Sequence, residues 1–422
     1  MPHAEFQLLL ACIRARLAGE PIDIDSVEWS KLDWTEVVSL ALRHKIAPLV
    51  NSFQEDLRGI TPLESIRLNR RCRSILTKNF ELARQLQSIH ETLLGADIPL
   101  MAIKGPTLAI EIHGGLQHRQ FSDLDVLICP DDLAPTLQLF MQLGYQVEGP
   151  AVHQLSESRL RKFASRSREL SLIRQEGNRT AAVDLHWGLS DDSHFFATDH
   201  AALFAANSSC SIGGSAVCTA PFEFQLVYLA LHAIGHQCAR LSWLFDFAVA
   251  LNRLTDAEIQ DFLQGLSYSH RRIVICAMLM MERLELIENI DDVVKDGAKW
   301  RRTFASMIQT MIDSATRQDA RLLLGSYANG LWKWQLTGRV RPFINSLAMA
   351  VVPAEQDWLA PGWYGPYVSR MKCLSANTAK LISGFLRTQE EPAVVEETVT
   401  SKVLKFEDPS AIKIKDQNSR AA

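Results

Sequence analysis

The 422-residue chain lacks three features that would place it in a specialised class of protein. Its eight cysteines are scattered and form no C-x-x-C pair, which argues against a cysteine-rich zinc site and fits a reducing compartment. The formal net charge is only −4, so nothing indicates overall attraction to nucleic acid or to an anionic membrane. No apolar run approaches the roughly 20 residues that cross a bilayer. We therefore expect a cytoplasmic globular protein with neither membrane nor nucleic acid as a partner.

Hydrophobic periodicity divides the chain into four predicted segments. Residues 1–95 repeat apolar positions at steps of three and four, which is typical of helices, and begin without the basic segment or cleavage site of a secretion signal. Residues 96–220 alternate short apolar runs with helical stretches bounded by glycine and proline, which indicates a small α/β core. Residues 221–387 return to helical patterning. Residues 388–422 are rich in charge and lack an apolar period, which predicts a mobile tail.

The core segment contains the predicted strands. Apolar runs at 98–103 and 123–128 are each expected to form a strand that a helix follows. Two more strands are expected at 168–174 and 181–187, joined by a turn at EGNR. The predicted fold class is therefore α+β or α/β, with a small mixed sheet and its helices flanked by N-terminal and C-terminal helical segments.

Three aspartates in this core carry the most informative chemistry. Asp123 and Asp125 alternate with apolar residues, so their carboxylates project from one face of the predicted strand. Asp184 lies between two apolar residues of a later strand. Neighbouring carboxylates repel each other, a bound divalent cation relieves that repulsion, and magnesium suits oxygen ligands. If the strands are adjacent, the three aspartates are expected to hold two magnesium ions for an in-line phosphoryl displacement.

Residues close to the aspartates predict a place for phosphate groups. Lys104 ends the first strand, and Gly105 lets the backbone approach an anion where the next helix begins. Arg119 and Ser122 come just before the aspartate pair and are candidates for the same nucleotide-binding role. The basic residues between 159 and 168 are interpreted as a solvated helix face rather than an anion site, because aromatic neighbours are nearly absent.

Several histidines admit two interpretations. His186 shares a face with the third aspartate, and it either contacts a nucleotide or serves as a structural histidine at the sheet edge. His232 and His236 are one helical turn apart and would make a zinc site with Asp246 as third ligand. No glutamate follows His232 as in H-E-x-x-H, so we favour a position lining the cleft opposite the aspartates, with Arg240 as a candidate phosphate contact.

These motifs occur together in an order that resembles a known family. Its pattern combines L-K-G, then R-x-x-x-D-I-D-L-L-V, then V-D-L-H-W; here these stand as Ile103-Lys104-Gly105, Arg119 to Ile128, and Val183 to Trp187. The flanking segments ALRHKIAPLV and LHAIGHQCARLSWLFDFAVAL agree with it. The chain thus resembles, over roughly residues 30–385, the uncharacterised bacterial nucleotidyltransferase family of the DNA polymerase β superfamily.

The resemblance implies a nucleotidyltransferase fold and a metal-binding role for Asp123, Asp125 and Asp184. One departure from the wider superfamily is evident, because most active members carry Gly-Ser where this chain has Lys104-Gly105. The first hypothesis is an enzyme that transfers a nucleoside monophosphate from a nucleoside triphosphate to an unidentified acceptor, which is a small molecule, a sugar, a peptide or a protein. The second is a non-catalytic nucleotide-binding or assembly protein that keeps the fold. The third is a helical zinc hydrolase.

Overall fold

The computed structural model describes residues 3–148, 152–165, 167–177, 179–190, 196, 198–316, 333–337, 341 and 344, all within one unit, Met1–Lys372. Its α-helices are α1 (Ala4–Ala18), α2 (Trp34–Arg43), α3 (Ala47–Ser52), α4 (Pro62–Leu94), α5 (Pro106–Glu111), α6 (Leu133–Gln142), α7 (Glu157–Ala164), α8 (His200–Ala205), α9 (Phe222–Gly235), α10 (Leu241–Leu251), α11 (Asp256–Gly265), α12 (Tyr268–Arg283) and α13 (Gly297–Thr316). Its strands are β1 (Met101–Ala102), β2 (Leu124–Leu127), β3 (Gln146–Val147), β4 (Glu169–Glu176), β5 (Arg179–His186), β6 (Ser208–Ile212) and β7 (Ser215–Thr219).

The strands form a seven-stranded mixed sheet in the order β3-β4-β5-β2-β1-β7-β6. The β2–β5 and β1–β7 pairs are parallel, and the remaining neighbours are antiparallel. The structure is therefore a mixed α+β fold, as the sequence predicts at that level. The adjacency of β2 and β5 matters most, because these strands carry the predicted aspartates.

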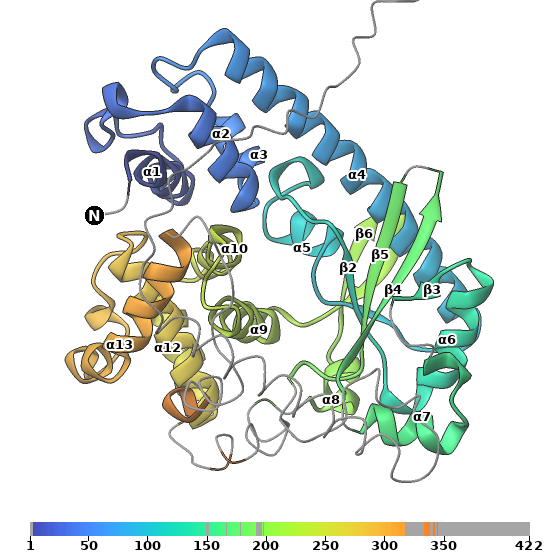
Figure 1. Ribbon diagram of the computed structural model, residues 1–422. Helices are drawn as coiled ribbons and strands as arrows, with labels where there is room; N and C mark the ends of the chain where they lie inside the picture. The colour runs from blue at the N-terminus through green and yellow to red at the C-terminus, as the bar shows by residue number, and fades with distance from the viewer. Residues whose placement is uncertain are drawn as a thin grey trace, which may run out of the picture. The chain divides into compact units, whose positions relative to one another are not determined.

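One face of the sheet is apolar and is covered by helices. Alternate residues of β2, β4 and β5 are fully buried there, as Val126, Leu172 and Val183 illustrate, and they share a hydrophobic core with α4 and α6. Figure 1 shows α4 running along the sheet. Because side chains alternate between faces, the polar residues of the same strands must project from the other face, toward α9.

Helix α4 begins and packs as its sequence predicts. Thr61 caps it by accepting a hydrogen bond from the Glu64 N–H, and Pro62 occupies the first turn, where its missing N–H costs nothing. Its buried stripe includes Leu82, Leu86 and Ile89 at steps of three and four residues. This 33-residue helix supports the apolar face of the sheet and so fixes the strands that carry the site.

A second hydrophobic core joins helices from both ends of the described chain. It combines α1 to α3 with α9, α10, α12 and α13, and α9 packs against both α10 and α12. Helix α10 is tied to the end of α2, because the Leu241 N–H donates to His44 Nδ1 (3.2 Å) and the Ser242 N–H donates to the His44 carbonyl (3.1 Å). These contacts hold the α2–α3 corner beside the polar face of the sheet.

The sequence located most elements of the core but not all of their extents. The strand expected at 98–103 shrinks to Met101–Ala102, because the Ile98 N–H still donates to the Leu93 carbonyl (2.9 Å) and completes the end of α4. The β6–β7 hairpin and the short β3 were not predicted. The two strands of the hairpin are made largely of Ser, Cys and Ala, and they turn at Gly213-Gly214, both with positive φ.

Several expectations concern residues outside this description. The mobile tail predicted for 388–422 and most of the helical stretch predicted after 316 lie outside the described residues. The four-segment division of the chain stays a prediction. The seven described cysteines are all free thiols. Within the described part of the chain, no helix is both long and apolar enough to cross a membrane.

Candidate active site

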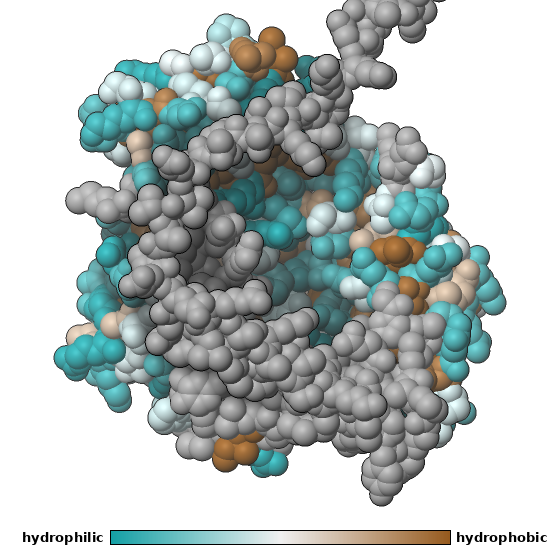
Figure 2. All heavy atoms as spheres, viewed as in Figure 1, coloured by the Kyte–Doolittle hydropathy of each residue, from teal (hydrophilic) through white to brown (hydrophobic). Residues whose placement is uncertain are grey.

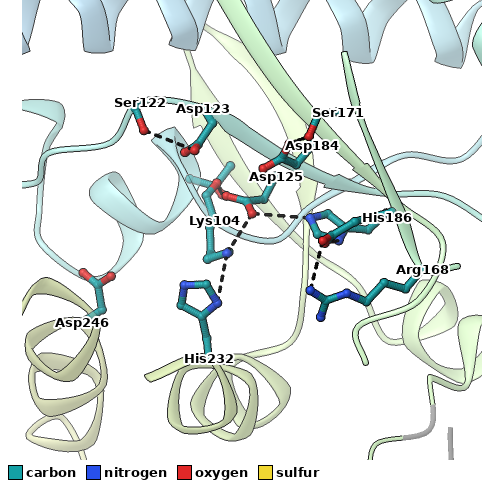
Figure 3. Close-up of polar contacts among 12 residues, drawn as sticks. Lys104, Ser122, Asp123, Asp125, Arg168, Ser171, Asp184, His186, His232 and Asp246 are labelled. Atoms are coloured by element: carbon teal, nitrogen blue, oxygen red, sulfur yellow. Dashed lines mark hydrogen bonds and ion pairs between the residues drawn. The ribbon is translucent and has the colours of Figure 1, made fainter. Parts of the chain in front are cut away.

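The polar face of the sheet brings two of the predicted aspartates into direct register. Asp125 of β2 lies opposite Asp184 of the parallel strand β5, and Asp123 directly precedes the first residue of β2. Figure 3 shows Asp125 and Asp184 on the side of the sheet that faces α9, with Asp123 beside Ser122. The approach of Asp125 to Asp184 therefore rests on strand pairing, whereas the gathering of all three carboxylates around one ion stays a prediction.

Asp125 is held by a buried ion pair. Its Oδ1 lies 2.8 Å from Lys104 Nζ, and both residues expose less than a tenth of their surface. Burial alone would raise the pKa of Asp125, but the adjacent Lys104 ammonium and the nearby His186 imidazole lower it. Burial likewise opposes the charge of Lys104, and the Asp125 carboxylate overrides it and raises the lysine pKa. Both groups are thus ionised and compensate each other.

Asp184 has a different environment. Ser171 Oγ, on the neighbouring strand β4, donates a hydrogen bond of 2.7 Å to Asp184 Oδ1. Burial raises the pKa of Asp184, and the negative charge of Asp125 adds to that effect, while the Ser171 hydroxyl opposes it. Unlike Asp125, this carboxylate has no ion pair with a lysine or arginine among the described residues.

Asp123 connects the sheet to the N-terminal helices. Ser122 Oγ donates to Asp123 Oδ2 (3.2 Å), and Lys45 Nζ donates to Ser122 Oγ (2.9 Å). Lys45 belongs to the corner between α2 and α3, so a residue 77 positions away in sequence reaches the aspartate motif. Ser122 was predicted as a site residue, whereas Lys45 was not.

His186 bridges two carboxylates. Its Nε2 lies 3.5 Å from Asp125 Oδ1, and its Nδ1 lies 3.1 Å from Glu169 Oε2. Burial would lower the pKa of this histidine, but contacts with the two carboxylates raise it. Burial would raise the pKa of Glu169, yet His186 and Arg168 lower it to about 2. The imidazole therefore lies between Asp125 and Glu169 in the wall of the site.

Helix α9 forms the opposite wall. It contributes Tyr228, His232 and His236 to a cavity of about 270 Å³ whose other side is lined by Lys104, Asp125, Asp184 and His186. Figure 2 shows hydrophilic side chains gathered in a hollow on this face. His232 Nδ1 lies 3.5 Å from Lys104 Nζ.

Both histidines of this wall are neutral. Burial lowers the pKa of His232 well below its usual range, and Lys104 and His236 add to this effect. Burial, with Lys104, lowers the pKa of His236 to about 4. The preferred interpretation, a cleft wall opposite the aspartates, agrees with where these residues lie.

Arg119 and Asp246 form an ion pair. The Arg119 guanidinium donates from Nε (2.9 Å) and Nη2 (2.8 Å) to the two carboxylate oxygens of Asp246, and His113 Nε2 lies 2.8 Å from the same carboxylate. This buried pair joins the sheet motif to α10. The nucleotide-binding role of Arg119 stays a prediction. The Asp246 carboxylate thus contacts Arg119 and His113, whereas the zinc hypothesis had paired it with His232 and His236. Arg240 stacks over the Trp243 ring, 5.3 Å from its centroid.

Gly105 adopts a conformation that favours glycine, with φ of 72°. The helix that it opens, α5, has only six residues, and Thr107 Oγ1 at its start donates to the Lys104 carbonyl (3.2 Å). The backbone anion site expected there therefore stays a prediction. Of the basic residues between 159 and 168, Arg168 lines the cavity, whereas Arg161 is exposed on α7 and pairs with Glu157.

Sequence reasoning missed four residues of this site: Lys45, Glu169, Ser171 and Tyr228. Glu169 and Ser171 are recognisable once β4 is paired with β5, because they lie opposite His186 and Asp184. Tyr228 precedes His232 by one helical turn and so shares its face. Nothing local in the sequence marks Lys45, since its approach to Ser122 depends on how α2 packs.

The donor set suits a magnesium ion in kind, because Asp125 and Asp184 are carboxylates on paired strands and Asp123 directly precedes β2. Their present contacts are with the protein: Asp125 with Lys104, Asp184 with Ser171 and Asp123 with Ser122. Within the described residues, no group of three or more His, Cys, Asp or Glu side chains is arranged to hold a metal ion. Metal binding by Asp125 would thus share this carboxylate with Lys104 or displace the lysine from it.

Fold and site together define an α+β protein of nucleotidyltransferase type. The chain belongs to the family described as uncharacterised nucleotidyltransferase, which matches residues 30–284. A solved structure, an antigenic nucleotidyltransferase-like protein from Paracoccidioides brasiliensis, is similar at 13% identity and a TM-score of 0.33, covering 55% of this chain and 93% of that one. A search of curated proteins found no match. Family membership indicates a general role in nucleotidyl transfer.

Proposed function

We propose that this protein transfers a nucleoside monophosphate from a nucleoside triphosphate to an acceptor hydroxyl, with a catalytic core of the DNA polymerase β superfamily. The observation that supports this best is the register of β2 and β5, which sets Asp125 against Asp184 with Asp123 beside them. An aspartate triad of this kind matches the charge requirement of phosphoryl transfer. The proposed acceptor is a small molecule, sugar, peptide or protein, and the cytoplasm is the proposed location.

Each residue of the site has a proposed task. Asp123, Asp125 and Asp184 would hold magnesium, two ions in the full site, which when bound neutralises phosphate charge and polarises the reacting oxygens. Lys104 leaves Asp125 and pairs with a phosphate oxygen. His186 keeps Asp125 oriented through its contacts with that carboxylate and with Glu169. The neutral imidazoles of His232 and His236 line the cavity without adding charge to it.

The test is pyrophosphate release from purified protein supplied with magnesium, α-labelled nucleoside triphosphates and a fractionated cell extract as acceptor source. We expect label transfer and pyrophosphate release by the natural chain, and a loss of at least about 100-fold in Asp125→Asn and Asp184→Asn. The matched control is Asp131→Asn, an exposed aspartate a few residues beyond β2, which should retain full activity. Equal magnesium–nucleotide binding by the natural chain and Asp184→Asn would contradict the proposed site.

A second candidate function is supported by one observation. The Lys104–Asp125 pair neutralises a proposed metal ligand from within the protein, and the same lysine stands where most active superfamily members have glycine. A nucleotide-binding or assembly protein without turnover would retain such a pair. Magnesium-independent nucleotide binding with no pyrophosphate release in any acceptor fraction would favour this alternative.

A further inference from the structure

Lys45 occupies a backbone position where glycine is the usual residue. Helix α2 ends in a left-handed cap, in which the Lys45 N–H donates to the Leu42 carbonyl (3.1 Å) and the Ile46 N–H donates to the Ala41 carbonyl (2.9 Å). Lys45 has φ of 56° within this cap. Glycine is favoured there because it adopts positive φ without the steric cost that a Cβ imposes. A lysine at this position therefore makes the cap less stable than a glycine would.

The cap directs the lysine toward the aspartate motif. Lys45 is half-buried, and its Nζ donates one hydrogen bond, to Ser122 Oγ (2.9 Å), whose hydroxyl in turn donates to Asp123. No other partner of this ammonium is found among the described residues. Because His44 ties the corner to α10, the direction of the side chain is set by packing.

Two lysines thus flank the aspartates, and their charges are balanced differently. The Asp125 carboxylate compensates Lys104 and raises its pKa. Burial lowers the pKa of Lys45, and Asp123 opposes this only in part, while Arg240 and Arg119 add to the lowering. Of these two lysines, Lys45 is the one whose positive charge the neighbouring carboxylates balance only in part. A cation of this kind attracts an anion.

Arg119, predicted as a phosphate ligand, is engaged with Asp246 in this structure. Its bidentate pair with Asp246 commits two of its guanidinium nitrogens to α10. A phosphate chain next to Asp123 would therefore need a different cation, and Lys45 already reaches Ser122, the residue before that aspartate.

We propose that Lys45 binds the phosphate chain of the nucleotide beside Asp123, so that the α2–α3 corner forms part of the nucleotide site. This inference rests on the proposed function for its ligand class, a polyphosphate bound with a divalent cation. Lys45 and Lys104 would contact the anion from opposite flanks of the aspartates, Lys45 through the donors that Ser122 leaves free.

The test is isothermal titration with magnesium and inorganic tripolyphosphate, which avoids the unknown base preference, repeated with ATP. Lys45→Gly should weaken tripolyphosphate binding at least tenfold, while its melting temperature stays equal to that of the natural chain or rises, because glycine suits the cap. Lys45→Arg should bind within about threefold of the natural chain. Loss of binding with tripolyphosphate as well as ATP assigns the contact to the phosphates and not to the base.

Asp97 provides a matched control. It ends α4 in the same left-handed cap, with φ of 57°, its N–H donating to Leu94 and the next N–H donating to Leu93, and it is exposed. Asp97→Gly should show the same effect on melting and no effect on affinity. Unchanged affinity in Lys45→Gly would overturn the inference, as would a loss of affinity that accompanies a fall in melting temperature and that Lys45→Arg does not restore.

Failure of the proposed function would look different. A natural chain that binds tripolyphosphate through Lys45 but transfers no nucleotide would sink the transferase proposal and leave this inference standing. If Lys45→Gly transfers nucleotides as well as the natural chain does, the transferase proposal stands and the inference about Lys45 fails.

Discussion

The ammonium nitrogen of Lys104 lies 2.8 Å from Asp125 Oδ1, in a pair from which water is almost fully excluded. The lysine thereby occupies the carboxylate that a magnesium ion would use in the proposed reaction. Two positive charges beside one carboxylate repel each other, so metal binding is expected to loosen the Lys104 ion pair. Nucleotide phosphates would favour this loosening by giving Lys104 a new anionic partner.

Removal of Lys104 should strengthen metal binding in the absence of nucleotide. In Lys104→Met, Asp125 no longer has its lysine counter-ion, and we expect the affinity for Mn²⁺ to rise at least tenfold because the metal no longer competes with an ammonium. Mn²⁺ binding is measured by electron paramagnetic resonance. Lys78→Met, at an exposed position on α4, serves as the control and should bind as the natural chain does. Weaker Mn²⁺ binding in Lys104→Met than in the control would contradict this competition.

The same substitution should also reveal the cost of an uncompensated carboxylate. Without metal, Lys104→Met is expected to lose about 3–5 kcal/mol of folding free energy, because a buried charge remains without its partner. The double variant Lys104→Met with Asp125→Asn should recover most of this loss. Denaturant unfolding in EDTA measures both, and a double variant no more stable than the single one would show that the charge is not the cause.

Arg119 should prove more important for stability than for nucleotide affinity. Lys cannot reproduce the two parallel hydrogen bonds to Asp246, so Arg119→Lys is expected to lower the melting temperature by several degrees. Its affinity for magnesium–nucleotide should stay within about threefold of the natural value. Thermal melting and titration on the same preparation compare the two effects, and a large loss of affinity at unchanged melting temperature would restore Arg119 to the nucleotide site.

The buried His44 should make the folded state sensitive to acid. Burial, reinforced by Arg43 and Arg240, lowers its pKa from 6.5 to about 3. The unfolded chain therefore takes up a proton near pH 6.5 that the folded chain refuses until about pH 3. The stability from the neutral imidazole is complete above pH 6.5 and falls with pH through this window, by about 1.4 kcal/mol per unit.

His44→Asn isolates this contribution. The asparagine oxygen can replace Nδ1 as acceptor for the Leu241 N–H without titrating. Stability measured between pH 7 and pH 4 should fall less steeply in the variant than in the natural chain. Equal slopes would mean that His44 does not contribute to the acid sensitivity.

The predictable parts of this protein are those that depend on local patterns. Alternation placed Asp125 on the polar face of a strand, although β2 begins one residue after Asp123, and the Thr61 cap with Pro62 located the start of α4. The hairpin β6–β7 was not predicted, because its residues are mostly small or polar and strands are usually enriched in β-branched residues.

The partners of each site residue could not be read in the same way. Arg119 and Asp246 are 127 positions apart, and Lys45 and Ser122 are 77 apart, so both contacts depend on the packing of helices against the sheet. Sequence spacing suggested that Arg119 serves the phosphates, but a buried carboxylate from α10 holds it. Composition and periodicity carry no information on such long-range pairs.

The most direct measurement is a crystal structure of the protein with Mn²⁺ and a non-hydrolysable nucleoside triphosphate, using anomalous scattering to locate the metal. We expect anomalous peaks within coordination distance of Asp123, Asp125 and Asp184, with Lys104 withdrawn from Asp125 toward a phosphate oxygen. Absence of metal from the aspartates while the nucleotide is bound, or a peak at His232 and His236 instead, would contradict the proposed site.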